Sequence, residues 1–459
     1  MNRPLLIKLG AIAVLMLLLL IPLLMIDGLV GERQAYRDGV LQDIARSSAY
    51  EQRLSGPLLV VPYVRSVLEW RHDEKTDTHV QVRREKRGRL YFLPERFVVD
   101  GNLTTELRHR GIYEARLYHA QSRIQGGFVV PANYGISEDL DSYRFEQPFL
   151  AVGISDVRGI QNVPRLAFGG RQLDFAAGSG ERLLGDGLHV ALPIAPSSTE
   201  QRFDYGFDLN LLGSSRLAIA PVGRESQVNL SADWPHPSFD GEYLPTERSV
   251  DAKGFTANWR TSFFASGMED ALKDCVGEKN CNAFQGRSFG VSLIDPVDQY
   301  LKADRALKYA LLFIGLTFAG FFLFEVLKGL ALHPVQYALV GLALALFYLL
   351  LLLSLTEHIG FELAYLASAG ACVALIGFYL STVLHSVLRG CAFAFGLALL
   401  YGALYGLLRA EDYALLMGSL LLFAVLAGVM ALTRRLDWYG VGRQPEAPQF
   451  SLDEVSRVG

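Results

Sequence analysis

LGAIAVLMLLLLIPLLMI, at residues 9–26, is a run of 18 residues without a charged side chain. A helix rises about 1.5 Å per residue, so the run approaches the roughly 20 residues needed to cross about 30 Å of hydrocarbon. A cleaved signal peptide is the competing interpretation, but its apolar region is shorter and ends at an A-x-A-like site. The sequence favours an uncleaved membrane anchor at residues 1–27.

Charged residues are distributed very unevenly along the rest of the chain. Of 90 charged residues (43 basic and 47 acidic), residues 27–305 hold 71, whereas residues 306–433 hold 9 in 128 positions. This pattern excludes a cytosolic enzyme and a disordered chain. It also excludes a nucleic-acid binder, because the polar part is slightly acidic and phosphate neutralisation needs a positive face. An integral membrane protein with a domain-sized insert remains.

Five further apolar runs follow the insert in quick succession. They predict helices at residues 307–327, 335–355, 363–384, 391–408 and 413–432, which give six spans with the anchor and form a bundle at residues 306–433. Basic residues of short loops set orientation, and they fall on one side here: Arg3, Lys8, Lys328, Arg389, Arg434 and Arg435. Both termini, including the tail at residues 434–459, are therefore predicted to be cytoplasmic, and residues 28–305 periplasmic.

The insert is predicted to be a mainly β domain with a helix at each end. Amphipathic spacing predicts a helix at residues 32–54 that Gly56-Pro57 stops, and Asp295-Pro296 predicts the start of the helix entering the second span. Between them, short alternating runs bounded by Gly, Pro, Asp or Asn predict an antiparallel, sandwich-like domain. The basic residues 83–87 are expected at a solvated hairpin turn, with contact to anionic lipid headgroups as the alternative.

Sequence motifs of catalysis are lacking. The signatures for nucleotide cradling, acyl transfer, zinc hydrolysis and dinucleotide binding do not occur. Nine His residues are scattered without a metal-binding arrangement. We therefore expect no enzyme, and no catalytic, cofactor-binding or metal-binding residue.

Cysteine placement agrees with an exported insert. Cys275 and Cys281 enclose five residues within it, where a disulfide can persist, whereas Cys372 and Cys391 lie in or beside predicted spans. The spacing favours a disulfide between Cys275 and Cys281 over two free thiols. A metal pair is less favoured, because no His lies close by.

Four polar residues near the span ends are candidates for function in the membrane. Glu325 lies three residues before Lys328, so the two can pair on one helix face. A buried carboxylate is costly and marks a functional site, whereas a pair at the membrane interface is the alternative. His333 begins the turn before the third span. Glu357 and His358 are adjacent in the opposite loop, as a proton-handling pair or as ordinary loop residues.

Small residues form one face of a later span. Gly402 and Gly406 are four residues apart, with Ala398 one turn earlier. Such spacing lets helix backbones approach closely. It predicts packing against a neighbouring helix.

Several long strings in the chain are distinctive: GPLLVVPY (56–63), APVG (220–223), WPHPSFDG (234–241), LKYALLFIGLTFAGFFLFE (307–325), HPVQYALVGLALALFYLL (333–350), TEHIGF (356–361) and EDYALL (411–416). They resemble the CreD family of inner-membrane proteins, also called cell envelope integrity protein CreD. The resemblance covers nearly the whole chain. It implies a Gram-negative inner-membrane protein linked to a two-component response, which affects envelope integrity, tolerance to certain colicins and the response to beta-lactams. It implies no catalytic residue.

Three functional hypotheses follow. The favoured one is a non-enzymatic envelope protein whose exported domain binds a periplasmic or envelope protein partner, while the bundle is anchored in the lipid bilayer. The second is a transporter or proton-coupled channel that uses Glu325, Glu357 or His358. Its polar residues lie at span ends, which counts against it. The third is an envelope hydrolase with an unrecognised site.

Overall fold

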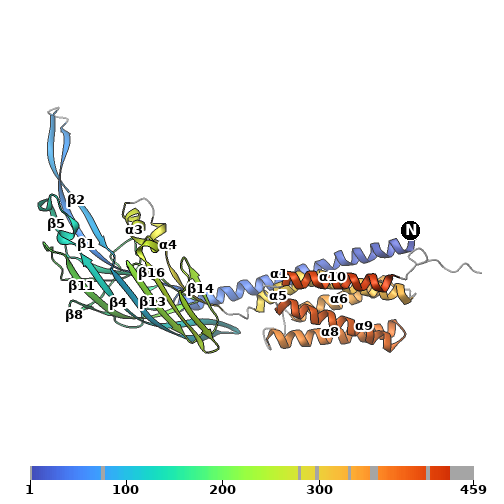
Figure 1. Ribbon diagram of the computed structural model, residues 1–459. Coiled ribbons are helices and arrows are strands. Elements are labelled where there is room, and N and C mark those ends of the chain that lie inside the picture. Colours follow the sequence, from blue (N-terminus) through green and yellow to red (C-terminus); the bar gives the residue numbers. More distant parts are fainter. Residues whose placement is uncertain are drawn as a thin grey trace, which may run out of the picture. The chain divides into compact units, whose positions relative to one another are not determined.

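The computed structural model describes residues 3–73, 78–277, 281–294, 299–328, 332–351, 360–409 and 414–434. The chain divides into two compact units (Figure 1). The helical unit comprises Met1–Tyr36 and Val297–Gly459, and the β unit comprises Arg37–Pro296. Helix α1 (Arg3–Ser47) contributes residues to both units.

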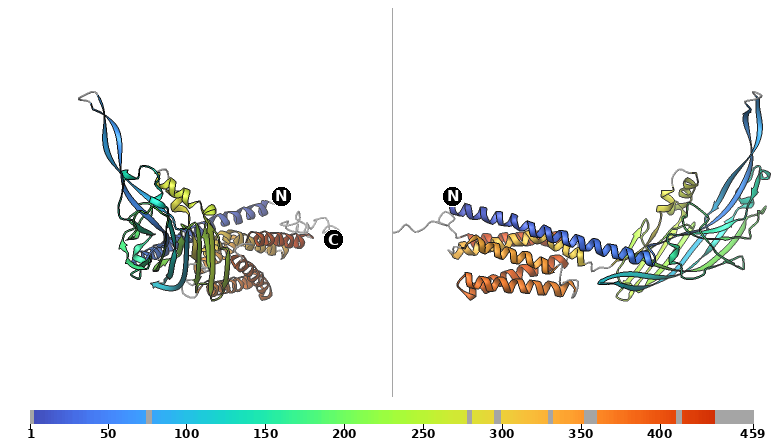
Figure 2. Two further views of the ribbon diagram at one scale, coloured as in Figure 1. Left: turned by 60° about the vertical axis from the view of Figure 1, so that its left-hand side comes forward. Right: turned by 180° about the vertical axis from the view of Figure 1, so that it is seen from behind.

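The helical unit consists of helices (Figure 2), and these helices are apolar. After α1 they are α5 (Gln299–Lys328), α6 (Pro334–Leu349), α8 (Phe361–Val383), α9 (Val387–Arg409) and α10 (Ala414–Thr433). Among the described residues, five helices are long and apolar enough to cross a membrane, whereas α6 is a shorter apolar helix of 16 residues. The prediction of several membrane-crossing helices is confirmed, whereas the sixth predicted span, at residues 335–355, stays a prediction.

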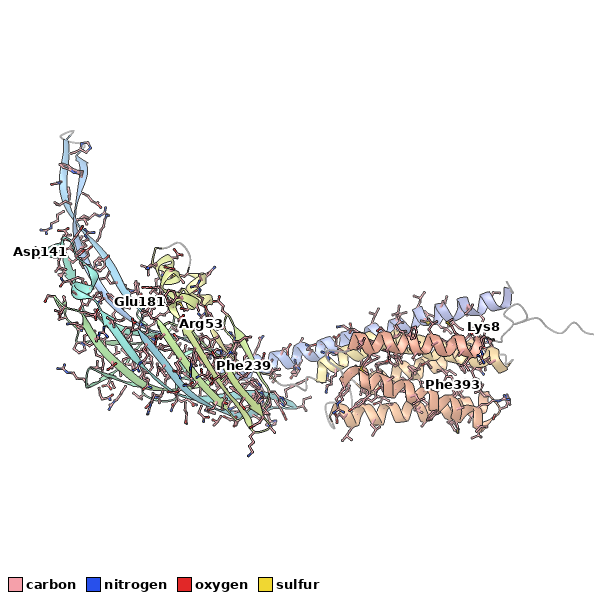
Figure 3. The ribbon with its side chains drawn as sticks, in the orientation of Figure 1. Lys8, Arg53, Asp141, Glu181, Phe239 and Phe393 are labelled. Carbon is pink, nitrogen blue, oxygen red and sulfur yellow. A yellow bond between two sulfur atoms is a disulfide. The ribbon has the colours of Figure 1, made fainter. Side chains whose placement is uncertain are left out.

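Helices of this unit pack through aromatic and small residues. Phe321 of α5 contacts Phe393 of α9, with ring centroids 5.6 Å apart (Figure 3). Gly341 of α6 lies where α1 and α5 approach it. A Cβ added there would meet the side chain of Leu19 and would lie 2.8 Å from Cζ of Phe318. Only a residue without a side chain leaves this contact undistorted.

The β unit contains two sheets among its described residues. The order in sheet A is β14-β17-β12-β1-β6-β10-β9, and β2 and β5 also pair with β1. Its strands are β1 (Gln52–Asp73), β2 (Thr78–Phe92), β5 (Tyr143–Phe145), β6 (Phe149–Ile154), β9 (Ala176–Ala177), β10 (Gly187–Ala191), β12 (Arg216–Ile219), β14 (Pro237–Gly241) and β17 (Phe289–Leu293).

Sheet B has the order β15-β16-β13-β3-β4-β11-β7-β8. Its strands are β3 (Arg96–Arg110), β4 (Tyr113–Val130), β7 (Arg165–Phe168), β8 (Arg171–Asp174), β11 (Gln201–Ser214), β13 (Glu225–Ala232), β15 (Glu247–Asp251) and β16 (Gly254–Ser262). Short helices connect the strands: η1 (Ala132–Gly135), η2 (Leu140–Ser142), η3 (Val157–Gly159), α2 (Phe263–Ser266), α3 (Met268–Val276) and α4 (Asn282–Gly286).

The sheets share one hydrophobic core and are mixed in direction. Leu58 and Val60 of sheet A belong to the same buried cluster as Phe97 and Trp259 of sheet B. Most strand pairs are antiparallel, but β1 pairs with β12, and β3 with β13, in parallel. The β-rich prediction is confirmed, and the purely antiparallel arrangement is wrong. Parallel pairs need long crossover connections, which alternation within single strands does not reveal.

Two local predictions in the β unit are also wrong. The helix predicted at residues 32–54 ends at Ser47, and Gly56-Pro57 lies inside β1. Pairing with β12 already begins at Gln52, so residues 52–54 belong to a β-strand and not to the helix. The basic residues 83–87 are part of β2 and pair with β1, so they are not a turn.

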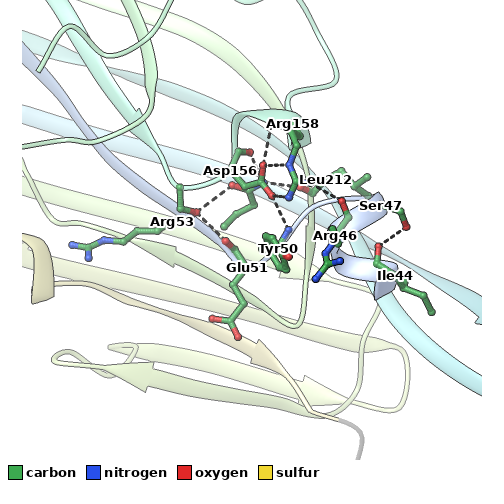
Figure 4. Close-up of polar contacts among 11 residues, drawn as sticks. Ile44, Arg46, Ser47, Tyr50, Glu51, Arg53, Asp156, Arg158 and Leu212 are labelled. Carbon is green, nitrogen blue, oxygen red and sulfur yellow. Dashed lines mark hydrogen bonds and ion pairs between the residues drawn. The ribbon is translucent and has the colours of Figure 1, made fainter. Parts of the chain in front are cut away.

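The last turn of α1 is fixed to the β unit by a buried carboxylate (Figure 4). The Tyr50 N–H donates to Asp156 Oδ2 at 3.0 Å, and the Arg158 guanidinium pairs with the same oxygen at 2.6 Å. Arg158 also donates to the carbonyl of Arg46 at 2.6 Å, and Gln52 donates to the carbonyl of Asp156 at 2.9 Å. These bonds set where the helix ends and β1 begins.

Candidate functional site

Glu325, near the end of α5, is buried, with 6% of its surface exposed. Its Oε1 forms an ion pair with the Lys8 ammonium of α1, which Figure 3 labels. The Leu332 N–H donates to the same oxygen at 3.1 Å, and the Tyr337 hydroxyl of α6 donates to Oε2 at 2.9 Å. Lys8 also donates to the carbonyl of Leu332 at 2.9 Å. The carboxylate thus joins α1, α5 and α6.

This arrangement changes the interpretation of Glu325. The sequence paired it with Lys328 on the same helix, whereas the structure pairs it with Lys8, 317 residues away. Both carboxylate oxygens are engaged, which is what makes an ionised group tolerable in an apolar bundle. The geometry is that of a structural clamp between helices. Sequence spacing had no signal for it, because the partner belongs to a distant helix.

Of the other membrane candidates, the structure describes only His333. His333 caps α6: its Nδ1 accepts from the Val335 N–H at 3.3 Å, while its own N–H donates to Gln336 Oε1 at 3.1 Å. Such a box satisfies backbone donors at the start of a helix. Glu357 and His358 lie outside the described residues, so the hypothesis of a proton-handling pair stays a prediction.

The four cysteines occupy distinct environments. Cys275 of α3 and Cys281, just before α4, form a disulfide. Cys372 is buried in α8, where the Tyr401 hydroxyl donates to its sulfur at 3.2 Å. Cys391 of α9 is exposed.

A cavity of about 870 Å³ lies between α8 and α9. Tyr365, Ala369, Cys391 and Gly402 are among its mostly apolar lining residues. A Cβ added to Gly402 would meet nothing within 4 Å, so the predicted helix contact is wrong at this residue. At Gly406 the same Cβ would lie 3.4 Å from the Met417 side chain of α10, so that glycine does face a neighbouring helix.

A buried carboxylate is also found in the β unit. Glu181 pairs with Arg89 at 2.8 Å and accepts from the Tyr91 hydroxyl at 3.0 Å (Figure 3). Burial, together with the Glu181 charge, raises the pKa of Tyr91 to about 12. Arg89 also donates to the carbonyl of Gly180 at 3.1 Å. The group therefore holds the glycine-rich loop at residues 178–181 against β2.

The outer face of sheet B carries two adjacent rows of polar side chains, here called the polar rows. Strand register aligns the first row as Glu247, Asn258, Asn229, Asp100, Arg123 and Asp208. It aligns the second as Ser249, Thr256, Ser231, Asn102, Gln121 and Asn210. Residues paired directly across strands, and those two apart along a strand, share one face of a sheet. The twelve side chains therefore form a continuous surface over six strands.

Hydrogen bonds between neighbours order the polar rows. Asn229 Nδ2 donates to Asp100 Oδ1 at 2.6 Å, and Ser231 Oγ donates to Asn102 Oδ1 at 2.9 Å. Arg123 pairs with Asp208 at 2.9 Å. A hollow of about 660 Å³ lies over the rows, lined by Asp100 and Asn229 among others. Sequence reasoning missed this surface, because β3 and β13 are neighbours only through a parallel pairing across more than a hundred residues.

The fold defines an integral membrane protein class in which a large β-rich insert follows the first of several apolar helices. The family model for Inner membrane protein CreD matches residues 4–439, and the chain belongs to this family. It is similar to Inner membrane protein CreD of Escherichia coli (strain K12), with 38% identity over 463 residues that cover 100% of this chain and 99% of the relative. The resemblance inferred from sequence strings is thereby confirmed.

Solved structures give much weaker matches. An M1 zinc metallopeptidase from Deinococcus radiodurans aligns with 37% of this chain and 38% of its own, at 8% identity and a TM-score of 0.19. Native yeast LTA4 hydrolase aligns with 49% of this chain and 35% of its own, at 10% identity and a TM-score of 0.19. Likeness at this level carries no argument about fold or activity. Within the described residues, no group of three or more His, Cys, Asp or Glu is placed to hold a metal ion.

Proposed function

We propose that this chain is a non-enzymatic inner-membrane protein that supports cell envelope integrity and the envelope stress response. In this proposal the β unit is a periplasmic, sandwich-like domain that binds an envelope component, and the helical unit is its six-span anchor with both termini in the cytoplasm. Family membership over residues 4–439 supports the inner-membrane assignment. Colicin tolerance and the beta-lactam response are the expected phenotypes.

The observation that carries the proposal is the pair of polar rows. Eight of these twelve positions hold amides or hydroxyls, and two of the four charged side chains, Arg123 and Asp208, pair with each other. Amides and hydroxyls both donate and accept, and here their mutual bonds order them before any ligand arrives. Such a surface suits an uncharged, hydroxyl-rich ligand such as an envelope glycan.

The transporter remains a second candidate because a buried hydroxyl in the described part of the helical unit lacks a hydrogen-bond partner. Ser368 of α8 is buried, and its hydroxyl has no hydrogen-bond partner among the described residues. Thr317 of α5 is also buried, and its hydroxyl donates to the carbonyl of Phe313 in its own helix. Glu325 supports the anchor instead, because its oxygens are occupied by Lys8, Leu332 and Tyr337.

Site-specific photo-crosslinking in cells tests the proposal. A photoreactive residue at Asn102 or Gln121 is expected to give an adduct of discrete mass with an envelope component. The same residue at Arg182, an exposed position outside the polar rows, is the control and gives none. Equal labelling at all three positions, or no adduct at normal protein levels, contradicts binding by the polar rows.

A second measurement separates anchor from transporter. If the helical unit is an anchor, Glu325→Gln at normal protein levels keeps the envelope phenotype. Loss of the phenotype at normal protein levels, with a crosslink at Asn102 retained, supports the transporter.

A further inference from the structure

Strands β1 and β2 continue beyond their sheet as a two-stranded ribbon (Figures 1 and 2). Their ladder runs from the Leu59–Phe92 pair to the Asp73–Thr78 pair. Strand β6 pairs with β1 only as far as Val60, and β5 only at Tyr63–Arg65. Within the described part of the chain, residues 66–73 and 78–85 therefore pair only with each other; these two segments are called the ribbon.

Large apolar side chains of the ribbon are uncovered. Trp70 is 68% exposed, Leu68 is 64% exposed and Val82 is 42% exposed. Leu68 and Trp70 are two residues apart and so share one face of the ribbon. An isolated two-stranded ribbon is marginally stable in water, and a neighbouring apolar pair is an unusual surface to leave there. A partner that covers the face with Leu68 and Trp70 would therefore stabilise the ribbon.

The charged residues beside Leu68 and Trp70 indicate which kind of partner this face binds. Arg83 lies directly opposite Leu68 on the same face and makes no ion pair with any described residue. On the other face, Glu69 pairs with Lys86 at 2.6 Å and with Arg84 at 3.4 Å. The apolar face therefore presents Arg83, which makes no ion pair with a described residue, next to an indole ring and an aliphatic chain, with Glu85 two residues further along the same face.

We propose that the ribbon binds the surface of an anionic phospholipid bilayer through Trp70, Leu68 and Arg83. Indole rings are favoured at the headgroup level, with their apolar part toward the acyl chains. Arginine keeps its charge among lipid phosphates while its stem lies along apolar surface. Contact with lipid headgroups is the alternative that the sequence leaves open for residues 83–87. The structure adds apolar side chains, Leu68 and Trp70, on the same face as Arg83. The proposal goes beyond the function above, since it concerns another surface and another ligand.

Vesicle flotation with the full chain tests the proposal. The protein is held in nanodiscs of phosphatidylcholine and mixed with vesicles of phosphatidylcholine, with or without phosphatidylglycerol. We expect flotation with the phosphatidylglycerol vesicles alone, and weaker binding at high salt, because exposed charges are screened. Trp70→Thr, which keeps a residue favoured in strands, is expected to weaken binding about tenfold or more.

Matched controls separate the ribbon from general surface effects. Phe264→Ala removes an aromatic residue of α2 that is 84% exposed, and it is expected to leave flotation unchanged. Arg83→Gln is expected to weaken binding several-fold and to reduce its salt dependence, whereas Arg171→Gln on β8 is not.

Three results would overturn the proposal. The first is flotation that does not depend on phosphatidylglycerol, and the second is an equal loss for Trp70→Thr and Phe264→Ala. The third is a photo-crosslink from position 68 to a protein with none to lipid, which would make the occupant a protein. Circular dichroism of each variant verifies that the β unit has kept its strands.

Discussion

The ammonium of Lys8 contacts the carboxylate of Glu325 across a separation of 317 residues. Lys8 belongs to the first turns of α1, and Glu325 to the last turn of α5. The contact makes the first helix a packed member of the helical unit and not only a membrane tether. Tyr337 and Leu332 complete the same cluster from α6 and the segment before it.

Removing one partner of this ion pair should cost more than removing both. Lys8→Met leaves the Glu325 carboxylate buried without its cation, which is expected to destabilise the helical unit by up to about 3 kcal/mol, since Lys8 is partly exposed. The double variant Lys8→Met with Glu325→Gln should lose less than Lys8→Met alone, and therefore less than the sum of the single variants. Thermal unfolding in detergent measures the cycle, and additive losses would speak against a coupled pair.

Gly341 and Gly402 should respond differently to the same change. In Gly341→Ala the new methyl group meets Leu19 and Phe318, so we expect a loss of about 1–3 kcal/mol. Gly402→Ala meets nothing within 4 Å and should be neutral or stabilising, by up to about 1 kcal/mol from helix propensity. Thermal unfolding of the two variants side by side decides this, and equal losses would contradict the described packing.

Acid should weaken the junction at Asp156. Hydrogen bonding from Arg158 holds the pKa of Asp156 below its usual range. The unfolded chain has an Asp pKa of about 3.9. At pH values between the lowered folded pKa and this unfolded pKa, it therefore binds more protons than the folded chain. The stabilisation is therefore complete above about pH 4 and is lost as the pH falls through the lower folded value.

The variant Asp156→Asn isolates this contribution. Wild type should be more stable at neutral pH, and the difference should shrink as the pH falls below about 4. Denaturant unfolding of the full chain, followed by tryptophan fluorescence, measures it. A difference that stays constant with pH would assign the effect to shape and not to charge.

The disulfide between Cys275 and Cys281 should act as a local staple. It closes a short loop, so replacing both residues by Ser is expected to cost about 2 kcal/mol and to leave the β unit folded. Mass spectrometry with and without reductant should show the two thiols appearing together. A protein unable to fold without the bridge would contradict a purely local role.

Apolar helices were the part of this fold best anticipated from the sequence. The run predicted at residues 363–384 is α8 (Phe361–Val383), and that at 413–432 is α10 (Ala414–Thr433). Both are recognised because transfer into lipid depends on the composition of a single segment. The run at 335–355 is less clear, since α6 ends at Leu349 and residues 352–359 are outside the described part.

Relationships between segments were not anticipated. The polar rows exist only because β3 lies beside β13, and their alignment depends on a register that no single strand encodes. The partner of Glu325 was sought within reach on its own helix, although Lys8 lies 317 residues away. The basic residues 83–87 were interpreted as a hairpin turn, although they are part of β2 and pair with β1.

The separation of Lys8 from Glu325 also sets an order of events during biogenesis. Ribosomes add about 5–20 residues per second, so Lys8 precedes its carboxylate by about 15–60 s of synthesis. During that interval the whole β unit is synthesised, while Lys8 of α1 lacks its partner Glu325. The Lys8 ammonium of a nascent α1 therefore has no Glu325 carboxylate to pair with until α5 has been synthesised.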